Sequence, residues 1–141
     1  MSELQDLVEE LYRQFSEDDW ADAERIFSPD VVTVAPGSEP LHGVEPFKAY
    51  AAGFHRAAPD ARIALTQVVA ESGTAIACEG VFSGTNTGPL VGPMGELPAT
   101  GRSFELPFCD AFDVEEGKIT SHRVYFDQMA FLGQLGLIPG Q

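Results

Sequence analysis

Basic residues are scarce in this chain. It contains only 8 Lys and Arg against 22 Asp and Glu, which gives a formal net charge of −14. Because such a surplus of negative charge repels phosphate backbones and anionic lipid headgroups, nucleic acid and membrane surfaces are poor candidates as partners. Solubility is the simplest explanation of the acidity.

Long apolar runs and cysteine motifs are also missing. No stretch approaches the about 20 apolar residues that span a bilayer. The N-terminus, MSELQDLVEELYRQF, is acidic and helical in pattern, unlike a signal peptide. The two cysteines, Cys78 and Cys109, form neither a metal-binding spacing nor a disulfide framework. We therefore expect a cytoplasmic protein with free thiols.

Cofactor motifs are absent from the sequence as well. The three histidines, His42, His55 and His122, lack the ligand spacing of a metal site. The glycine-rich segment GPLVGPMG has no phosphate-binding pattern around it. We expect a function that needs neither metal nor cofactor.

Aromatic residues, by contrast, are plentiful. The chain has 141 residues, is 44% hydrophobic and contains ten Phe, three Tyr and one Trp. This length and composition suit one domain spanning residues 1–141. The aromatic area exceeds what so small a domain needs to fold, and it fits either the walls of an apolar cavity or a dimer face.

The hydrophobic periodicity changes from helical to strand-like along the chain. Apolar residues from Leu4 to Phe15 recur at i, i+3, i+4 and i+7, which predicts an amphipathic helix. Two further helices are expected, one over 19–27 and one that follows Gly43, has Pro46 in its first turn and ends before Pro59. Strands are expected over 31–35, 61–71, 74–83, 103–114 and from Lys118, with a long loop over 84–101. Helices followed by antiparallel strands indicate an α+β domain, with a curved sheet wrapped over the helices.

The segment ITSHRVYFDQMAFLGQLG at 119–136 begins as a strand and ends as a helix. Strict alternation places Arg123, Tyr125 and Asp127 on one face of the strand and His122 on the other. Asp127 lies at the junction, where it can cap the new helix or point into whatever the strand lines. Periodicity alone slightly favours the cap.

Two more carboxylates are candidates for a pocket. Asp110 shares a strand face with a row of apolar residues, and a lone carboxylate there is unfavourable unless it is paired, hydrogen-bonded or protonated. It is either a pocket acid or base, or a solvated residue near the open end of the strand, and the sequence favours neither. Glu79 could face the same cavity, but a solvated outward position is favoured.

The second half of the chain resembles the SnoaL-like polyketide cyclase family of the NTF2-like superfamily. The matching segments are GTNTG at 84–88, PATGR at 98–102, EGKI at 116–119, YFD at 125–127 and QLG at 134–136. The resemblance implies a cone of bent antiparallel sheet packed on three helices, an interior apolar pocket and frequently a homodimer. This sequence differs from the family pattern at Asn86, where a histidine is common, and at Asp110, near which some cyclases present a histidine.

The resemblance also implies site residues. In the cyclases an aspartate just after the last strand is the acid/base, which by position is Asp127. Arg123 together with Asp127 is similar to the epoxide-hydrolase branch. We therefore hypothesise an acid/base enzyme acting on a hydrophobic polyketide-, steroid- or terpenoid-like molecule, with Asp127 moving the proton and Arg123 and Asp110 assisting. The expected pocket residues are Tyr12, Trp20, Phe54, Glu79, Phe108, Phe112 and Tyr125. The alternatives are an epoxide hydrolase, a non-catalytic ligand-binding protein and a purely dimeric module whose pocket is filled by its own aromatics.

Overall fold

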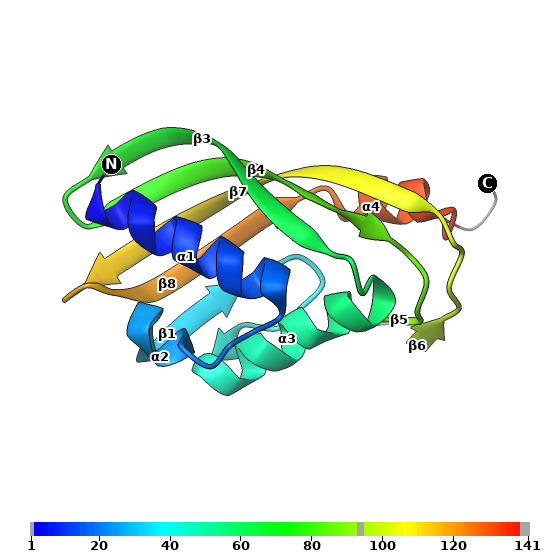
Figure 1. Cartoon of the computed structure of the whole chain (residues 1–141), viewed down its shortest axis with the longest axis horizontal. Coiled ribbons are helices and arrows are strands. Elements are labelled where there is room, and N and C mark those ends of the chain that lie inside the picture. The colour runs from blue at the N-terminus through cyan, green and yellow to red at the C-terminus, as the bar shows by residue number, and fades with distance from the viewer. Residues whose placement is uncertain (1, 93–94, 139–141) are drawn as a thin grey trace.

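A computed structural model describes residues 2–92 and 95–138. It contains a long bent sheet with helices beneath it (Figure 1). The elements are, in chain order, α1 (Glu3–Glu17), α2 (Ala23–Ile26), β1 (Phe27–Val34), β2 (Leu41–His42), α3 (Val44–Ala57), β3 (Arg62–Ser72), β4 (Ala75–Thr85), β5 (Leu90–Gly92), β6 (Gly95–Leu97), β7 (Ser103–Glu115), β8 (Lys118–Phe126) and α4 (Gln128–Leu135). The expected α+β class, with three helices in the first half, is confirmed.

The main sheet has six strands in the order β2-β1-β8-β7-β4-β3. Adjacent strands in this sheet run antiparallel, except β1 and β8, which run parallel to each other. In Figure 1 the long strands arch over α1 and α3, and α1 packs against β3 and β4. The space between these helices and the sheet is where the domain buries its aromatic residues.

Helix α1 follows the predicted amphipathic pattern. The Ser2 hydroxyl accepts a hydrogen bond of 3.0 Å from the Gln5 backbone N–H, which caps the first turn. The inward face buries Leu4, Val8, Leu11, Tyr12 and Phe15. The helix ends at Glu17, and the next residue, Asp18, has a left-handed backbone and bonds back to the last turn.

Helix α2 is shorter than the sequence predicts. It covers only Ala23–Ile26, and Phe27 already belongs to β1. The reason is tertiary, because Phe27 pairs with Ile119 of β8 and its side chain is buried in the core. Strand pairing therefore overrides the local helical periodicity in this segment.

The hairpin of β7 and β8 contains an irregularity that positions the site. Val114 pairs with Ile119, but Asp113 pairs with Ser121, so Thr120 has no cross-strand partner. This single extra residue is a β-bulge. It puts both Ile119 and His122 on the buried face, although strict alternation assigns them to opposite faces. From His122 onward, the even-numbered residues of β8 therefore face inward. Arg123, Tyr125 and Asp127, which were expected on one face around the pocket, fall on the opposite face.

The predicted loop over 84–101 contains the small hairpin of β5 and β6 and is anchored by Asn86. The Asn86 side chain is almost fully buried. Its amide donates to the carbonyl oxygens of Ala57 and Gly88, at 3.1 and 2.9 Å, and its Oδ1 accepts from the N–H of Thr100 at 2.9 Å. Asn86 thus joins the end of α3 to both ends of the loop. It therefore has a structural role at the position where a histidine is common in the family.

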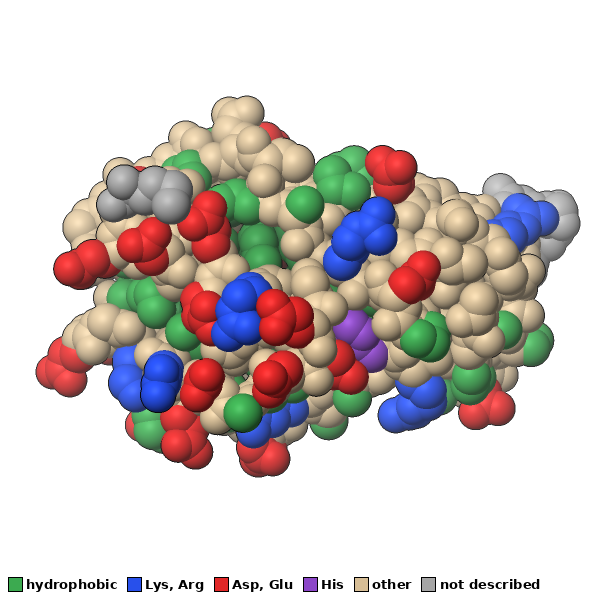
Figure 2. All heavy atoms as spheres, in the orientation of Figure 1, with side chains coloured by type: hydrophobic (Ala, Val, Ile, Leu, Met, Phe, Trp, Pro, Cys, Tyr) green, Lys and Arg blue, Asp and Glu red, His purple; other side chains and the backbone are tan. Residues whose placement is uncertain are grey.

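Acidic side chains dominate the surface over α1 and α2, with a few cations among them (Figure 2). Arg13 on α1 pairs with both Glu10 and Glu17. Hydrogen bonds from Arg13 hold the pKa of Glu10 at about 2, so this carboxylate stays ionised. Among the described residues, no helix has the length and apolar character required to cross a membrane.

Replacing Asn86 tests its anchoring role. Asn86→Ala removes hydrogen bonds from buried backbone groups and should lower the free energy of unfolding by about 2–4 kcal/mol. The neighbouring Thr87 is exposed, so Thr87→Ala should change it by less than about 0.5 kcal/mol. Chemical denaturation measures both. Equal stability of the two variants would contradict the role assigned to Asn86.

Candidate active site

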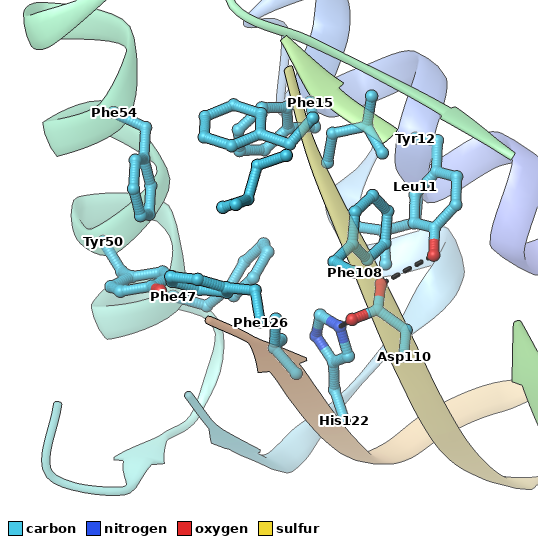
Figure 3. A pocket seen from close by; sticks show the side chains of 14 residues that line it. Leu11, Tyr12, Phe15, Phe47, Tyr50, Phe54, Phe108, Asp110, His122 and Phe126 are labelled. Carbon is cyan, nitrogen blue, oxygen red and sulfur yellow. Dashed lines mark hydrogen bonds and ion pairs between the residues drawn. The ribbon is translucent and has the colours of Figure 1, made fainter. Parts of the chain in front are cut away.

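A cavity of about 70 Å³ lies between the helices and the inner face of the sheet (Figure 3). One water molecule needs only about 10–15 Å³ of such space, so the cavity has room for part of a ligand. Its lining residues are Leu11, Tyr12 and Phe15 from α1; Phe47, Tyr50 and Phe54 from α3; and Ile63, Phe82, Leu106, Phe108, Asp110, His122, Val124 and Phe126 from the strands. This arrangement argues against a module filled by its own aromatics.

The walls of the cavity are held by aromatic contacts. Phe15 and Phe54 both meet Phe82 edge to face, with ring centroids 5.9 and 5.2 Å apart. Trp20 packs behind this layer, against Phe15 and Phe47. Because such edge-to-face pairs stabilise defined ring orientations, the cavity has fixed apolar walls.

The polar end of the cavity is built around Asp110, a residue that is only 3% exposed. The Tyr12 hydroxyl donates a hydrogen bond of 2.6 Å to Asp110 Oδ2. The other oxygen, Oδ1, lies 3.3 Å from His122 Nε2. That distance suits an ion pair, although the ring N–H is not aligned for a hydrogen bond. Asp110, Tyr12 and His122 are called the acid cluster below.

His122 is held in place mainly by ring packing. Phe112, its cross-strand partner, stacks on the imidazole with a centroid distance of 4.6 Å and an interplanar angle of 11°. Phe47 closes another side at 5.8 Å. Neither ring nitrogen has a hydrogen-bond partner within the described part of the chain. The imidazole is therefore oriented toward Asp110 by its apolar neighbours.

The acid cluster can store and release a proton. Burial, reinforced by the nearby Asp110 carboxylate, raises the pKa of Tyr12 far above its ordinary value, so the phenol keeps its proton and acts as a donor. A buried carboxylate is stable only when hydrogen bonds or an opposite charge compensate it. Tyr12 supplies the hydrogen bond, and His122 can supply the charge. Asp110 can thus exist as a carboxylate and accept a proton from a bound molecule.

Asp127 does not belong to this cluster. Its side chain is exposed, and its Oδ1 accepts a hydrogen bond of 2.9 Å from the Ala130 backbone N–H, which caps α4. The expectation that its carboxylate points into the pocket is wrong, because β8 presents His122, Val124 and Phe126 to the cavity. The alternative weighed from the sequence, a helix cap, is what the structure shows.

Arg123 and Tyr125 also lie away from the cavity. Arg123 bonds to Asp113 at 3.0 Å and to Ser121 at 2.8 Å on the other face of the hairpin. Tyr125 is 56% exposed. The expected grouping of Arg123, Tyr125 and Asp127 around a substrate is therefore not present.

The remaining expected pocket residues divide into three groups. Tyr12, Phe54 and Phe108 line the cavity, as expected. Trp20 and Phe112 support its walls from behind without lining it. Glu79 is exposed on the outer face of β4 and takes no part.

His122 is the member of the acid cluster that sequence reasoning did not include. The signal that identifies it is the register of the β7–β8 hairpin. With the regular register that begins at Glu115 and Lys118, Asp110 would pair with Arg123; the bulge at Thr120 instead pairs it with Val124, beside His122. A one-residue change in register thus decides which basic residue accompanies the carboxylate.

Other reactive chemistry finds no support near the cluster. Cys78 is the cross-strand partner of Asp110, but burial raises the pKa of its thiol to about 11, so it stays protonated at neutral pH. Within residues 2–92 and 95–138, no group of three or more His, Cys, Asp or Glu side chains could hold a metal ion. The carboxylate, phenol and imidazole of the acid cluster are groups that can donate or accept protons.

The sequence profile of the SnoaL-like polyketide cyclase family matches residues 5–135, nearly the whole chain. The chain belongs to this family. No curated protein matches the sequence. The family assignment agrees with the resemblance seen in the second half of the sequence and extends it over the helices of the first half.

Solved structures give the same result for the fold. A candidate SnoaL-like polyketide cyclase from Jannaschia sp. CCS1 has a TM-score of 0.83 at 18% identity, covering 97% of this chain and 94% of that chain. TsrD from Streptomyces laurentii has a TM-score of 0.82 at 26% identity, covering 96% of each chain. IdmH from Streptomyces antibioticus, a candidate polyketide cyclase, has a TM-score of 0.76 at 27% identity, covering 94% of this chain and 97% of that chain. The expected NTF2-like cone, shared with ketosteroid isomerase-like proteins, is confirmed.

The capping role of Asp127 predicts a modest loss of stability on truncation. Asp127→Ala should lower the free energy of unfolding by about 1 kcal/mol, because the Ala130 N–H loses its acceptor. Asp127→Ser keeps a capping oxygen and should stay within about 0.5 kcal/mol of the original protein. Thermal or urea unfolding measures the difference. An Asp127→Ala variant as stable as the original would contradict the cap.

The raised pKa of Tyr12 predicts a dependence of stability on alkaline pH. Because the folded protein favours the protonated phenol, the contribution of Tyr12 is fully present below the ordinary pKa of about 10 and is lost as pH rises above it. The free energy of unfolding should therefore fall less steeply above about pH 10 in Tyr12→Phe than in the original protein, by up to about 1.4 kcal/mol per pH unit. Urea unfolding at several pH values measures both slopes. If the free energies of unfolding of the two proteins fall equally steeply with pH, the folded state does not favour the protonated phenol of Tyr12.

Proposed function

We propose that this protein is a cofactor-free acid/base enzyme of the cyclase or isomerase type, acting on a hydrophobic carbonyl compound of polyketide-, steroid- or terpenoid-like character. The observation that carries the proposal is the buried Asp110, hydrogen-bonded to Tyr12 and adjacent to His122 at the end of an aromatic cavity. A carboxylate in a cleft with a specific charge partner is a typical acid/base arrangement. In this proposal Asp110 takes the role that the family resemblance implied for Asp127.

The first step is removal of a proton from a carbon next to a carbonyl group. Asp110 accepts this proton, the C–H electrons form a new carbon–carbon double bond, and the carbonyl oxygen takes the negative charge of the enolate. Tyr12 holds the carboxylate in place through its 2.6 Å hydrogen bond. The apolar walls keep water from reaching the reactive carbanion.

The second step decides between cyclisation and isomerisation. In an aldol closure the enolate carbon attacks a second carbonyl of the same molecule, and the resulting alkoxide takes the proton back from Asp110. In an isomerisation the proton returns to a different carbon. Both routes leave Asp110 ready for another turnover, and in both the proton is carried by the acid cluster.

The comparisons support this class of reaction rather than hydrolysis of an epoxide. The family is named for polyketide cyclases, and IdmH, at 27% identity, is a candidate polyketide cyclase. The pairing of Arg123 with Asp127, which favoured epoxide hydrolysis, is absent because both side chains lie outside the cavity. Ligand binding without catalysis is the alternative that an experiment must exclude.

Exchange of carbon-bound hydrogen tests the proposal without the natural substrate. 2-Tetralone, a bicyclic ketone with activated hydrogens next to its carbonyl, is incubated with the protein in deuterated water, and NMR follows the loss of these hydrogens. The original protein should accelerate the exchange, and Asp110→Asn should reduce the acceleration by about 10²-fold or more, because the amide cannot accept the proton. Asp127→Asn is the matched control and should keep it.

Two results would contradict the proposed function. One is full exchange activity in a folded Asp110→Asn variant. The other is binding of 2-tetralone to the original protein without accelerated exchange, which would favour a non-catalytic binding protein. Circular dichroism and urea unfolding of Asp110→Asn establish that the variant is folded.

A further inference from the structure

Tyr50 contributes a second phenol to the cavity lining, and its hydroxyl has no hydrogen-bond partner among the described residues. Tyr50 belongs to α3, and its ring contacts Phe54 edge to face at 5.0 Å. Its hydroxyl oxygen is buried, and it forms no hydrogen bond with any part of the chain that the structure describes. Since buried polar groups are nearly always hydrogen-bonded in native proteins, this hydroxyl calls for an explanation.

The position of Tyr50 distinguishes it from Tyr12. The hydroxyl of Tyr12 is engaged by Asp110, so it orients the carboxylate and is not available to a ligand. Figure 3 shows Tyr50 and Phe54 on the α3 side of the cavity, with Asp110 and His122 on the opposite side. A molecule in the cavity therefore has the carboxylate on one side and a free phenol on the other.

The chemistry of the Tyr50 hydroxyl favours donation of a hydrogen bond. Burial, and to a smaller extent the nearby Asp110, raises the pKa of Tyr50 well above its ordinary value. The phenol thus keeps its proton at any pH at which the protein works. In an apolar cavity, such a donor interacts strongly with an oxygen that becomes negatively charged.

We propose that Tyr50 donates a hydrogen bond to the carbonyl oxygen of the bound molecule, the oxygen that becomes negatively charged when Asp110 removes the neighbouring proton. This inference rests on the proposed function and adds a requirement for the substrate. The substrate is a ketone or related carbonyl compound whose acidic C–H faces β7 while its oxygen faces α3. Hydrocarbons of the same shape meet the apolar walls but leave the phenol without a partner.

The carbonyl stretching band of bound 2-tetralone reports directly on this hydrogen bond. Infrared spectra are recorded with the original full-length protein, Tyr50→Phe and Tyr125→Phe. The band should move to lower frequency in the original protein and in Tyr125→Phe, whose ring is 56% exposed and lies outside the cavity. In Tyr50→Phe, most of the shift should be lost, because the ring remains but the donor is gone.

Affinities for a matched pair of ligands separate hydrogen bonding from packing. Tyr50→Phe should weaken the binding of 2-tetralone by about three- to tenfold, as expected for one neutral hydrogen bond. Binding of tetralin, the hydrocarbon without the oxygen, should change by less than about twofold, since the walls are unchanged. An equal loss for both ligands would overturn the proposal and assign Tyr50 a packing role.

The outcomes also separate this inference from the proposed function. An unshifted carbonyl band in the original protein, an unchanged band in Tyr50→Phe, or no binding of 2-tetralone to the original protein would each overturn the role of Tyr50. Exchange that still depends on Asp110 would in that case leave the proposed function standing. Conversely, a band shift that depends on Tyr50, together with no exchange activity, supports the hydrogen bond and removes the catalytic proposal. When both are correct, Tyr50→Phe also slows exchange by about 10²-fold.

Discussion

The hydrogen bond from Tyr12 to Asp110 is the constraint on which the site depends. It joins a helix at the start of the chain to a strand 98 residues later, inside a cavity that is otherwise almost entirely apolar. A carboxylate in such surroundings needs compensation, and the fold provides it from two directions, with a phenol from α1 and an imidazole from β8. The apolar packing of α1 against the sheet therefore stabilises the domain and at the same time brings the acid cluster together.

Much of the fold follows from local sequence patterns. The spacing of Leu4 to Phe15 predicts α1, and alternation predicts the long strands, because these elements each bury one regular face. Asp110 was identifiable for the same reason, as one carboxylate in an apolar row on β7. Its surroundings were not, because they depend on contacts with α1 and β8. The end of α2 could not be predicted either, since Phe27 is drawn into the sheet by its pairing with Ile119.

The placement of Asp127 shows how a family resemblance can predict the fold correctly and still place a side chain on the wrong face of a strand. The residue lies just after the last strand, as the resemblance requires, yet its carboxylate caps α4 and is exposed to solvent. Chain position specifies where a residue lies along a strand, but the face it occupies depends on register. In this protein the inward positions of β8 belong to His122, Val124 and Phe126, so the proposed base is Asp110 on β7 rather than the residue at the end of β8.

The bulge at Thr120 has a consequence for how members of this fold could diversify. Because it offsets the pairing of β7 with β8 by one residue, it exchanges the two faces of β8 over the rest of the strand. Without that offset, the same sequence would place the permanently charged guanidinium of Arg123 opposite Asp110 and turn the imidazole of His122 outward. A gain or loss of one residue at this bulge, outside the cavity lining, can thus replace a titratable partner by a fixed cation, with every residue that lines the pocket retained in the sequence.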